Sequence, residues 1–401
     1  MRADPEQTET GIGRRLLVVA AAARVVLLFL PGHPIDVAAF QAWALRLAEV
    51  GPLRFYGPDV FADYTPGYLL VLWPLGHLIR LLPAAGPPLV KAIPAAADFA
   101  VAALLAQLGG EHGRRTAAWY LLNPAVLFVG AFWGQAESVA IAWILAGWLA
   151  LTRGQMAWAG ALLGFGLLTK PQYAAVLPVA LIWMVRVGRT GKQWTTAAVA
   201  ATAAIVLPSL AFGMTPTELV ALLARSAGVY PYGSVNALNL WYLAGLNWRP
   251  DGTAVLGFPA VTWGWALVVV ALAVVLGACG RSSDAGRLYL ATAAILTAVF
   301  GLATRMHERY LFPALPFLLL AWAHRQAGRI QVVALSITLL GNLLYGFSYL
   351  STFARYRTPL WASVWDAMAW PTDNVFAALT IGLLGWLLAC LITPTLRQAL
   401  R

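Results

Sequence analysis

Long apolar runs alternate with short polar interruptions along the whole sequence. Many runs have the length, roughly 17–25 residues, that a helix needs to cross a bilayer. We therefore expect an all-α polytopic membrane protein with about 11–13 transmembrane helices, in which the whole chain, 1–401, forms one membrane domain. The runs lie at about 16–31, 66–83, 87–108, 116–132, 136–152, 155–169, 172–187, 194–212, 255–278, 287–303, 309–323, 330–349 and 375–393.

One of these runs, 87–108, is ambiguous because Lys91, Pro94 and Asp98 interrupt it. A proline removes a backbone hydrogen bond from a helix interior, and charged side chains are costly in lipid. The segment is therefore either a full span or a broken, re-entrant pair, and the pattern leaves both open.

Lys and Arg residues concentrate in alternate interruptions, and this sets the expected orientation. Because basic loops stay on the cytoplasmic side, we expect residues 1–13 to form a cytoplasmic tail and the loop 32–65 to be extracytoplasmic, in a plasma-membrane protein. All basic clusters lie inside together if 87–108 does not cross fully, and most acidic residues then lie outside. The clusters are Arg14/Arg15, Arg114/Arg115, Arg153, Arg186/Arg189/Lys192, Arg281/Arg287, Arg325/Arg329 and Arg397/Arg401.

Composition supports the membrane assignment and narrows the partners. A soluble domain carries about 25% charged residues, whereas this chain has 11% and is 61% hydrophobic. Its net charge of +11 fits basic loops in contact with anionic membrane lipids. No basic stripe interleaves with aromatics, so no nucleic acid partner is expected. Cys279 and Cys390 lie in or beside apolar runs, so neither a disulfide framework nor a cysteine metal site is expected.

The first long polar interruption, 32–65, carries the first candidate for chemistry. Asp36 lies near its start, residues 37–50 have the composition of a helix lying in the membrane interface, and Tyr64 and Tyr68 follow at its end. Asp36 is either the N-cap of that helix or a general base at the membrane boundary that takes a proton from an acceptor hydroxyl. The two roles are compatible.

Two further interruptions place polar groups at the expected outer face. Gln135 and Glu137 follow the helix-breaking pair Asn123-Pro124, and they either hold sugar hydroxyls or form an ordinary polar turn. Lys170 interrupts an apolar hairpin, either as a phosphate-binding cation or as a side chain that extends to the lipid headgroups.

The densest polar cluster lies in the segment 303–317, where Arg305, His307, Glu308 and Arg309 fall within five residues. If they begin a helix, Arg305 and Arg309 share one face. Guanidinium groups suit a lipid-linked phosphate because they form paired, charge-assisted hydrogen bonds with it. The alternative is a self-neutralising, solvated turn. A function is favoured because the cluster lies outside the cytoplasmic loops, against the usual charge distribution.

Other site chemistries lack their sequence motifs. The chain has no Gly-rich nucleotide loop after a strand, no H-E-x-x-H and no nucleophile-elbow sequence. It also has no D-x-D, the motif that commonly holds a nucleotide-sugar donor through a metal ion. That absence favours a donor in which the sugar is linked to a lipid phosphate.

Several motifs occur in order over about 36–313. They are an Asp after the first span (Asp36), W-A-x-x-L-x-x-x-G (Trp43 to Gly51), Y-x-P-G-Y (Tyr64 to Tyr68), N-P with G-Q-x-[DE] (Asn123 to Glu137), K-x-Q (Lys170 to Gln172) and H-E-R-Y-L-F-P (His307 to Pro313). Together they resemble the GT-C superfamily of polytopic glycosyltransferases. The greatest similarity is to bacterial mannosyltransferases related to the second mannosyltransferase of GPI-anchor assembly. Two departures are Thr65-Pro66, where relatives often have Pro-Pro, and Glu137, where many have Asp.

The resemblance implies an inverting transfer of a hexose, mannose in the nearest relatives, from a polyprenyl-phosphate sugar to a lipid or glycan acceptor at the extracytoplasmic face. It implies Asp36 as the base, with Glu137 as a second acid. The remaining implied residues are Arg305, His307, Arg309 and Lys170 for the donor phosphate, and Tyr64, Tyr68, Gln135, Gln172 and Glu308 for the substrates. No cofactor and no metal site are expected, although superfamily members with diphosphate donors use a divalent ion.

Two other classes of function compete with this interpretation. A lipid-linked-sugar flippase would have an inward-open cavity lined by Lys91 and Asp98. A non-catalytic subunit of a glycan-assembly complex would tolerate replacement of Asp36. The loops 213–253 and 351–373 are expected to select the acceptor. The sequence leaves the acceptor, the linkage position and the oligomeric state open.

Overall fold

The structure is a computed structural model that describes residues 5–279 and 284–392. Within these residues nearly all regular structure is helical, and the strands are two-residue pieces. β1 (Ser234–Val235) pairs in parallel with β4 (Met306–His307), and β2 (Ala254–Val255) pairs in antiparallel fashion with β3 (Phe258–Pro259). The prediction of an all-α polytopic membrane protein is confirmed.

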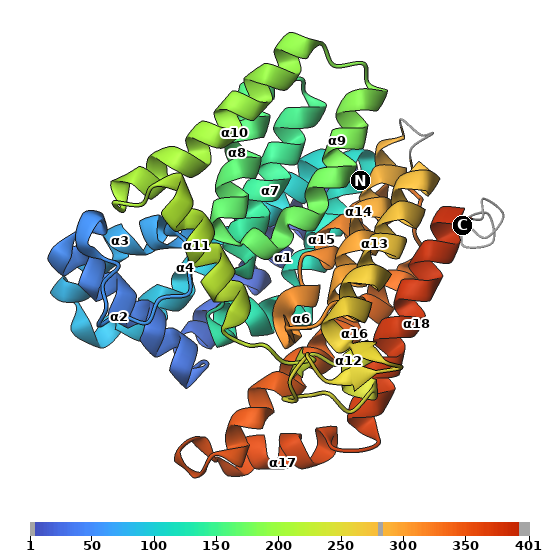
Figure 1. The fold of residues 1–401 in the computed structure, drawn as a ribbon. Coiled ribbons are helices and arrows are strands. Elements are labelled where there is room, and N and C mark those ends of the chain that lie inside the picture. Colours follow the sequence, from blue (N-terminus) through green and yellow to red (C-terminus); the bar gives the residue numbers. More distant parts are fainter. Residues whose placement is uncertain (1–4, 280–283, 393–401) are drawn as a thin grey trace.

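The helices follow the predicted apolar runs closely (Figure 1). The first half of the chain forms α1 (Pro5–Leu28), α2 (Pro34–Val50), α3 (Pro66–Leu81), α4 (Gly86–Leu108), α5 (Gly113–Leu121), α6 (Pro124–Leu127), α7 (Glu137–Thr152), α8 (Met156–Thr169), α9 (Leu177–Arg186) and α10 (Gly191–Ala211). The second half forms α11 (Pro216–Gly228), α12 (Leu240–Leu243), α13 (Ala260–Cys279), α14 (Ala285–Leu302), α15 (Ala314–Ala323), α16 (Arg329–Ser348), α17 (Pro359–Met368) and α18 (Thr372–Ile392).

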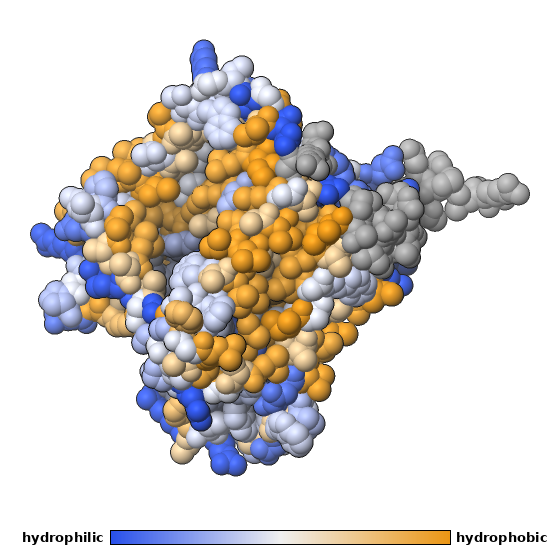
Figure 2. All heavy atoms as spheres, turned by 45° about the vertical axis from the view of Figure 1, so that its right-hand side comes forward, coloured by the Kyte–Doolittle hydropathy of each residue, from blue (hydrophilic) through white to orange (hydrophobic). Residues whose placement is uncertain are grey.

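Six helical segments of the described chain are long and apolar enough to cross a membrane, and a bent pair makes a seventh. This number is below the expected 11–13 because it leaves out shorter apolar helices such as α7 and α8. Figure 2 shows an apolar band between hydrophilic ends on one face of the molecule. Exposed side chains such as Trp265 and Val269 of α13 belong to the outward-facing apolar surface. In their most apolar windows, α14 is 78% buried and α10 only 6%, so α14 is central and α10 peripheral.

The ambiguous run forms the single continuous helix α4, so the expected alternative of a broken pair is wrong. Two contacts bind this helix to α1, one an ion pair and the other a hydrogen bond from a lysine to a backbone carbonyl. Arg24 Nε lies 2.9 Å from Asp98 Oδ2, with both side chains buried, and Lys91 Nζ donates to Leu27 O at 2.9 Å. Lys91 and Asp98 therefore hold two helices together, and neither has the free, cavity-lining position that a flippase would require.

The broken helix lies elsewhere in the chain. The segments 110–121 and 124–133 bend by 53° at the Asn123-Pro124 pair. The Asn123 side chain accepts from Ala125 N at 3.0 Å and caps the second segment, because proline removes the backbone donor there. The break was predicted from the sequence, and it redirects residues 128–133, which form a short π-helix that ends at Gly134.

Helices α2 and α3 form a hairpin whose hydrophobic core also includes Val90 of α4, Val139 of α7 and Phe212. This core includes Phe40, Trp43, Leu47, Phe55 and Tyr68, all buried. The main core is separate and is built largely from α4, α5, α7, α14, α15, α16 and α18. The predicted helix over 37–50 is confirmed by α2.

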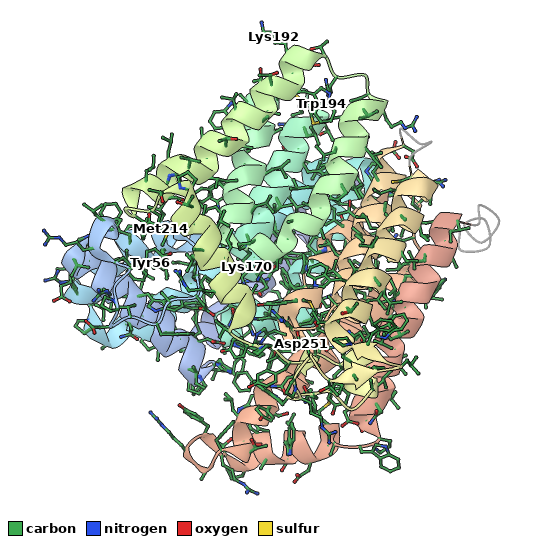
Figure 3. The ribbon with its side chains drawn as sticks, in the orientation of Figure 1. Tyr56, Lys170, Lys192, Trp194, Met214 and Asp251 are labelled. Atoms are coloured by element: carbon green, nitrogen blue, oxygen red, sulfur yellow. The ribbon has the colours of Figure 1, made fainter. Side chains whose placement is uncertain are left out.

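The two ends of the bundle carry different chemistry. At one end, loop cations bind backbone carbonyls and an amide: Arg189 Nη2 donates to Leu151 O at 3.1 Å, and Arg153 Nη2 donates to Gln107 Oε1 at 2.9 Å. Lys192 lies toward this end, while Lys170 and Asp251 lie toward the other (Figure 3). Part of the expected tail 1–13, and the basic residues Arg281, Arg397 and Arg401, lie outside the described residues.

Candidate active site

Asp36 lies in the first turn of α2 and is held by residues from a distant part of the chain. Its Oδ2 accepts from Trp133 Nε1 at 2.7 Å and from Gln135 Nε2 at 2.6 Å. The N-cap of α2 is His33, whose ring Nδ1 accepts from Asp36 N at 3.3 Å. The expectation that Asp36 caps this helix is therefore wrong, and its carboxylate faces the π-helix turn instead.

The environment of Asp36 favours its ionised form. Burial opposes the charge, but the positive fields of His33 and Arg309 and the hydrogen bonds from Trp133 and Gln135 outweigh burial and lower the pKa of Asp36 below its ordinary value. Burial also lowers the pKa of His33, so its ring is neutral at pH 7. Arg309 and the two hydrogen-bond donors therefore provide the stabilisation at neutral pH, and Asp36 is an anion that is still one-quarter exposed.

A glycine positions the two residues that bind Asp36. Gly134 has φ +95°, a left-handed conformation that favours glycine. A Cβ at this position would also lie 2.9 Å from Lys91 Cγ. The turn sends Trp133 and Gln135 to the same side, and the Trp133 ring stacks on His33 with centroids 4.8 Å apart.

Glu137 and Lys170 form a buried ion pair next to this turn. Lys170 Nζ lies 2.6 Å from Glu137 Oε1, and the two side chains are 2% and 0% exposed. Arg309 Nε lies 3.7 Å from the same oxygen. Burial lowers the pKa of Lys170, and Glu137 opposes that shift. The structure thus brings a predicted acid and two predicted phosphate ligands into one cluster, although they are far apart in sequence.

Arg309 is the cation common to the whole site. Its Nη1 lies 2.7 Å from Glu308 Oε1, and both side chains are nearly buried. Burial opposes its charge, but Glu308 first, and then Asp36 and Glu137 among others, raise the pKa of Arg309 well above its usual value. Gly346 of α16 packs against the Glu308 side chain, and its missing Cβ leaves room for that side chain. A Cβ at this position would collide with Glu308.

The expected helical face shared by Arg305 and Arg309 does not exist. Arg305 has φ +63°, β4 follows it, and Arg309 lies in the 3-10 helix Glu308–Leu311. Arg305 Nε lies 2.6 Å from Asp251 Oδ2, and its Nη1 donates to Ala227 O at 2.9 Å. The pairing of β4 with β1 turns the chain, and this separates the two guanidinium groups that a continuous helix would have aligned.

His307 stays with the site but brings no charge to it. Its ring packs edge-on against Tyr230 at 4.9 Å and near Tyr310 at 5.2 Å. Burial first, and then Arg309, lower the pKa of His307 well below its usual value. The ring is therefore neutral at pH 7 and can offer a ligand a hydrogen bond but no charge.

The predicted substrate-binding tyrosines surround the ion pair. Tyr64 OH donates to Gln135 Oε1 at 3.4 Å, and Lys170 Nζ lies 5.6 Å from the centre of the Tyr64 ring. Tyr68 is fully buried. Gly67 permits this arrangement, because a Cβ there would lie 2.6 Å from the backbone where α8 ends. Gln172 is half-buried in the 3-10 helix Pro171–Val176, just after Lys170.

Several buried polar atoms of this region have no hydrogen-bond partner within the described chain. They are Glu137 Oε2, Arg309 Nε, Tyr68 OH and Tyr173 OH. A buried polar atom without a partner costs about 1–3 kcal/mol. Unmet donors and acceptors in one cluster are what a hydroxylated, anionic ligand would satisfy. Within the described ranges, no three His, Cys, Asp or Glu side chains are grouped to hold a metal ion.

Sequence reasoning missed several residues of this region. Trp133 directly precedes the G-Q-x-[DE] motif, so its position in the motif could have indicated it. Asp63 is coupled by charge to Arg309, Asp36 and Lys170, and burial raises its pKa. Nothing in the sequence pattern distinguishes Asp63 from Asp59 or Gly346 from other helix glycines.

The fold and the site together define an integral membrane protein with a buried, charged and hydroxyl-rich centre at one end of a helical bundle. A family comparison identifies the chain more closely. It belongs to glycosyltransferase family 87, whose model matches residues 61–304, more than half of the 401-residue chain. A search of curated proteins finds no match.

The matched segment includes only part of the site. Glu137 and Lys170 lie within residues 61–304, whereas Asp36 precedes them and Arg309 follows them. The contacts of Asp36 with Trp133 and Gln135, and of Arg309 with Glu137, join both outer residues to the matched segment. The chain is therefore a membrane glycosyltransferase by family, with a site that extends beyond the region of the match.

Proposed function

We propose that this protein is an inverting glycosyltransferase of the GT-C type that moves a hexose, mannose in the first instance, from a polyprenyl-phosphate sugar to a lipid or glycan acceptor. The observation that supports it most is the pairing of an ionised, partly exposed carboxylate, Asp36, with a cluster of cations around Arg309. A base and a group of cations that can bind an anion are the two parts that such a transfer needs.

In this mechanism Asp36 takes the proton from the acceptor hydroxyl. The acceptor oxygen forms a bond to the anomeric carbon as the bond from that carbon to the phosphate oxygen breaks, which inverts the configuration. The electron pair leaves with the polyprenyl phosphate. Arg309 and Lys170 stabilise the growing negative charge, and neutral His307 donates a hydrogen bond to it.

Glu137 holds the two cations in place and offers its unpartnered oxygen to a sugar hydroxyl. Tyr64, Tyr68, Gln135 and Gln172 line the substrate space in this proposal, and the role of Glu308 is to position Arg309. These assignments rest on the contacts described above. Arg305 is 35% exposed and engaged with Asp251, so its proposed place is at the outer edge of the phosphate site.

The proposed orientation places this site at the extracytoplasmic face of the plasma membrane. The site lies at the opposite end of the bundle from the basic clusters, which favour the cytoplasm. Because α4 is a continuous span, the non-crossing segment required by the charge pattern is α3, which has 16 residues and packs against α2. The α2–α3 hairpin then lies at the outer interface, and the start of α1 lies in the cytoplasm.

Purified protein incubated with polyprenyl-phosphate mannose and a set of lipid and glycan acceptors tests the proposal. The expected products are a mannosylated acceptor and free polyprenyl phosphate in equal amounts, and the reaction should persist in EDTA. Polyprenyl-phosphate glucose and arabinose identify the sugar by comparison. Movement of intact donor across vesicles without release of phosphate would contradict a transferase and favour a flippase.

A further inference from the structure

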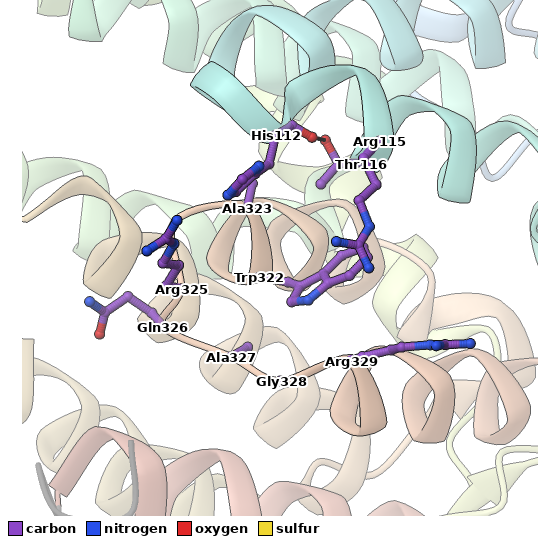
Figure 4. Close-up of a pocket in the computed structure, with 10 residues that line it drawn as sticks. All are labelled: His112, Arg115, Thr116, Trp322, Ala323, Arg325, Gln326, Ala327, Gly328 and Arg329. Carbon is purple, nitrogen blue, oxygen red and sulfur yellow. Dashed lines mark hydrogen bonds between the residues drawn. The ribbon is translucent and has the colours of Figure 1, made fainter. Parts of the chain in front are cut away.

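A cavity lies at the opposite end of the bundle from the candidate active site. It has a volume of about 360 Å³ and lies where α5 begins, α15 ends and α16 begins (Figure 4). Its lining includes His112, Arg115, Thr116, Trp322, Arg325 and Arg329. Because these are ends of apolar helices, the cavity opens at the level of a membrane surface.

Three guanidinium groups of this cavity lack an acidic partner. Arg115, Arg325 and Arg329 form no ion pair with any carboxylate in the described ranges, and Glu111, the nearest acid in sequence, pairs with none of them. Like charges around one cavity repel one another, so an anion in the cavity would stabilise them. Planar guanidinium groups bind phosphate oxygens through paired hydrogen bonds.

Two indole rings hold two of these guanidinium groups in place. Arg115 lies over the Trp322 ring at 4.4 Å, and Arg329 lies over the Trp119 ring at 5.3 Å. The two indoles meet edge to face with centroids 5.3 Å apart. Stacking fixes the planes of the guanidinium groups and leaves their N–H edges available for a ligand.

An apolar groove of about 430 Å³ begins at Trp119, next to the basic cavity. It lies between α1, α5 and α16 and is lined mainly by Leu16, Leu122, Val333, Ile337 and Leu340. On α16, Arg329 is followed at helical spacing by Val333, Ile337 and Leu340, so the groove continues along one helix face away from the cation.

The length of the groove matches one leaflet of a bilayer. The eleven steps along the helix from Arg329 to Leu340 rise about 16 Å, close to half of the roughly 30 Å hydrocarbon core. A phosphate headgroup in the cavity would therefore place an acyl chain in the groove, with its end near the middle of the bilayer. A free phosphate ion would fill the cavity alone and would leave the groove unused.

We propose that this cavity and groove form a binding site for an anionic phospholipid. The phosphate binds Arg115, Arg325 and Arg329, and one acyl chain lies along α16. The site is separate from the candidate active site, and the inference does not rest on the proposed transfer reaction.

Native mass spectrometry of the full-length protein in detergent tests this site, with phosphatidylglycerol and phosphatidylcholine of identical chains offered in equal amounts. We expect phosphatidylglycerol to be retained in clear excess. The double variant Arg115→Gln/Arg329→Gln should lose that excess by about tenfold, because two of three phosphate ligands are gone. The matched control is Arg114→Gln, which removes the neighbouring charge but does not line the cavity.

A second variant tests the acyl groove without altering any charge. Ile337→Trp narrows the groove at a half-exposed position, so it should weaken long-chain phosphatidylglycerol while leaving a dihexanoyl analogue unaffected. Melting temperatures with each lipid and with inorganic phosphate complete the test. Equal retention of phosphatidylcholine, an unchanged preference in the double variant, or stabilisation by inorganic phosphate as large as that by the lipid would each overturn the proposal.

Discussion

Replacement of Asp36 by Asn gives the sharpest test of the proposed base. The change keeps the size of the side chain but removes the negative charge that accepts from Trp133 Nε1 and Gln135 Nε2. A positioned general base contributes about 10²–10⁴-fold to a rate, which corresponds to about 3–5 kcal/mol in activation free energy. We expect kcat to fall within that range, with little change in KM for the donor.

The same variant should remain folded. A hydrogen bond to a charged group contributes about 1.5–3 kcal/mol, and the Asn carbonyl can still accept from one of the two donors. The expected loss of stability is therefore about 1–3 kcal/mol, well below that of a broken buried ion pair. Glu49→Gln is the matched control, because Glu49 is an exposed acid in the last turn of the same helix.

The assay measures release of polyprenyl phosphate over a range of pH. Because the pKa of Asp36 is lowered, its carboxylate is ionised at neutral and mildly acidic pH, and the wild-type rate should fall only as the pH drops below about 4. The ionised carboxylate also stabilises the fold, because its pKa is lowered there. This contribution to the free energy of unfolding is present at neutral pH and is lost in acid. A rate for Asp36→Asn within tenfold of wild type, or an unchanged acidic limb of its pH profile, would refute the role of base.

Three further substitutions test other parts of the site and the fold. Arg309→Gln should lower kcat about 10²–10³-fold, as loss of a single oxyanion-stabilising hydrogen-bond donor does in other enzymes. Arg305→Gln should lower kcat clearly less, and kcat values of the two variants measured with the same sugar donor check this order. Gly346→Ala should displace the carboxylate beside Arg309, so kcat should fall more than the melting temperature does, in parallel kinetic and thermal assays. Asp98→Asn should leave Arg24 buried without a counter-charge, with only the carbonyls of Ala20 and Leu121 as acceptors, and cost about 3–5 kcal/mol. The measurement is thermal stability in detergent, and a melting temperature equal to wild type would show that the pair is not structural.

The hydrophobic pattern predicted the fold well because bilayer-spanning helices must satisfy their backbone hydrogen bonds internally, so length and apolarity locate them. The site was harder to predict. Asp36, Glu137 and Lys170 could be chosen because charged groups near an apolar boundary are rare, but their contacts join residues as far apart in sequence as Glu137 and Arg309, which are separated by 172 positions. No linear pattern encodes such distances, and hydropathy alone could not show that Asp36 binds the Trp133–Gln135 turn.

The cluster at 305–309 shows why the arrangement of the site residues could not be predicted from the sequence. Its density suggested one helical face, but the left-handed backbone of Arg305 and the pairing of β4 with β1 depend on a strand more than 70 residues earlier. The charge pattern of the loops suggested that the run 87–108 does not cross the membrane fully, whereas the structure shows one continuous helix there. The charge pattern requires one segment that does not cross, and because α4 is continuous our proposal assigns that role to α3.

The second hydrophobic core, which is centred on the α2–α3 hairpin and is distinct from the main core, has a consequence for cooperativity. Elements with their own hydrophobic cluster open and close as units, at free energies below that of global unfolding. Asp36 belongs to this unit, whereas Arg309 and Lys170 belong to the main bundle. Amide hydrogens of α2 should therefore exchange before those of α14, and occupancy of the site by donor and acceptor together would tie the two units into one.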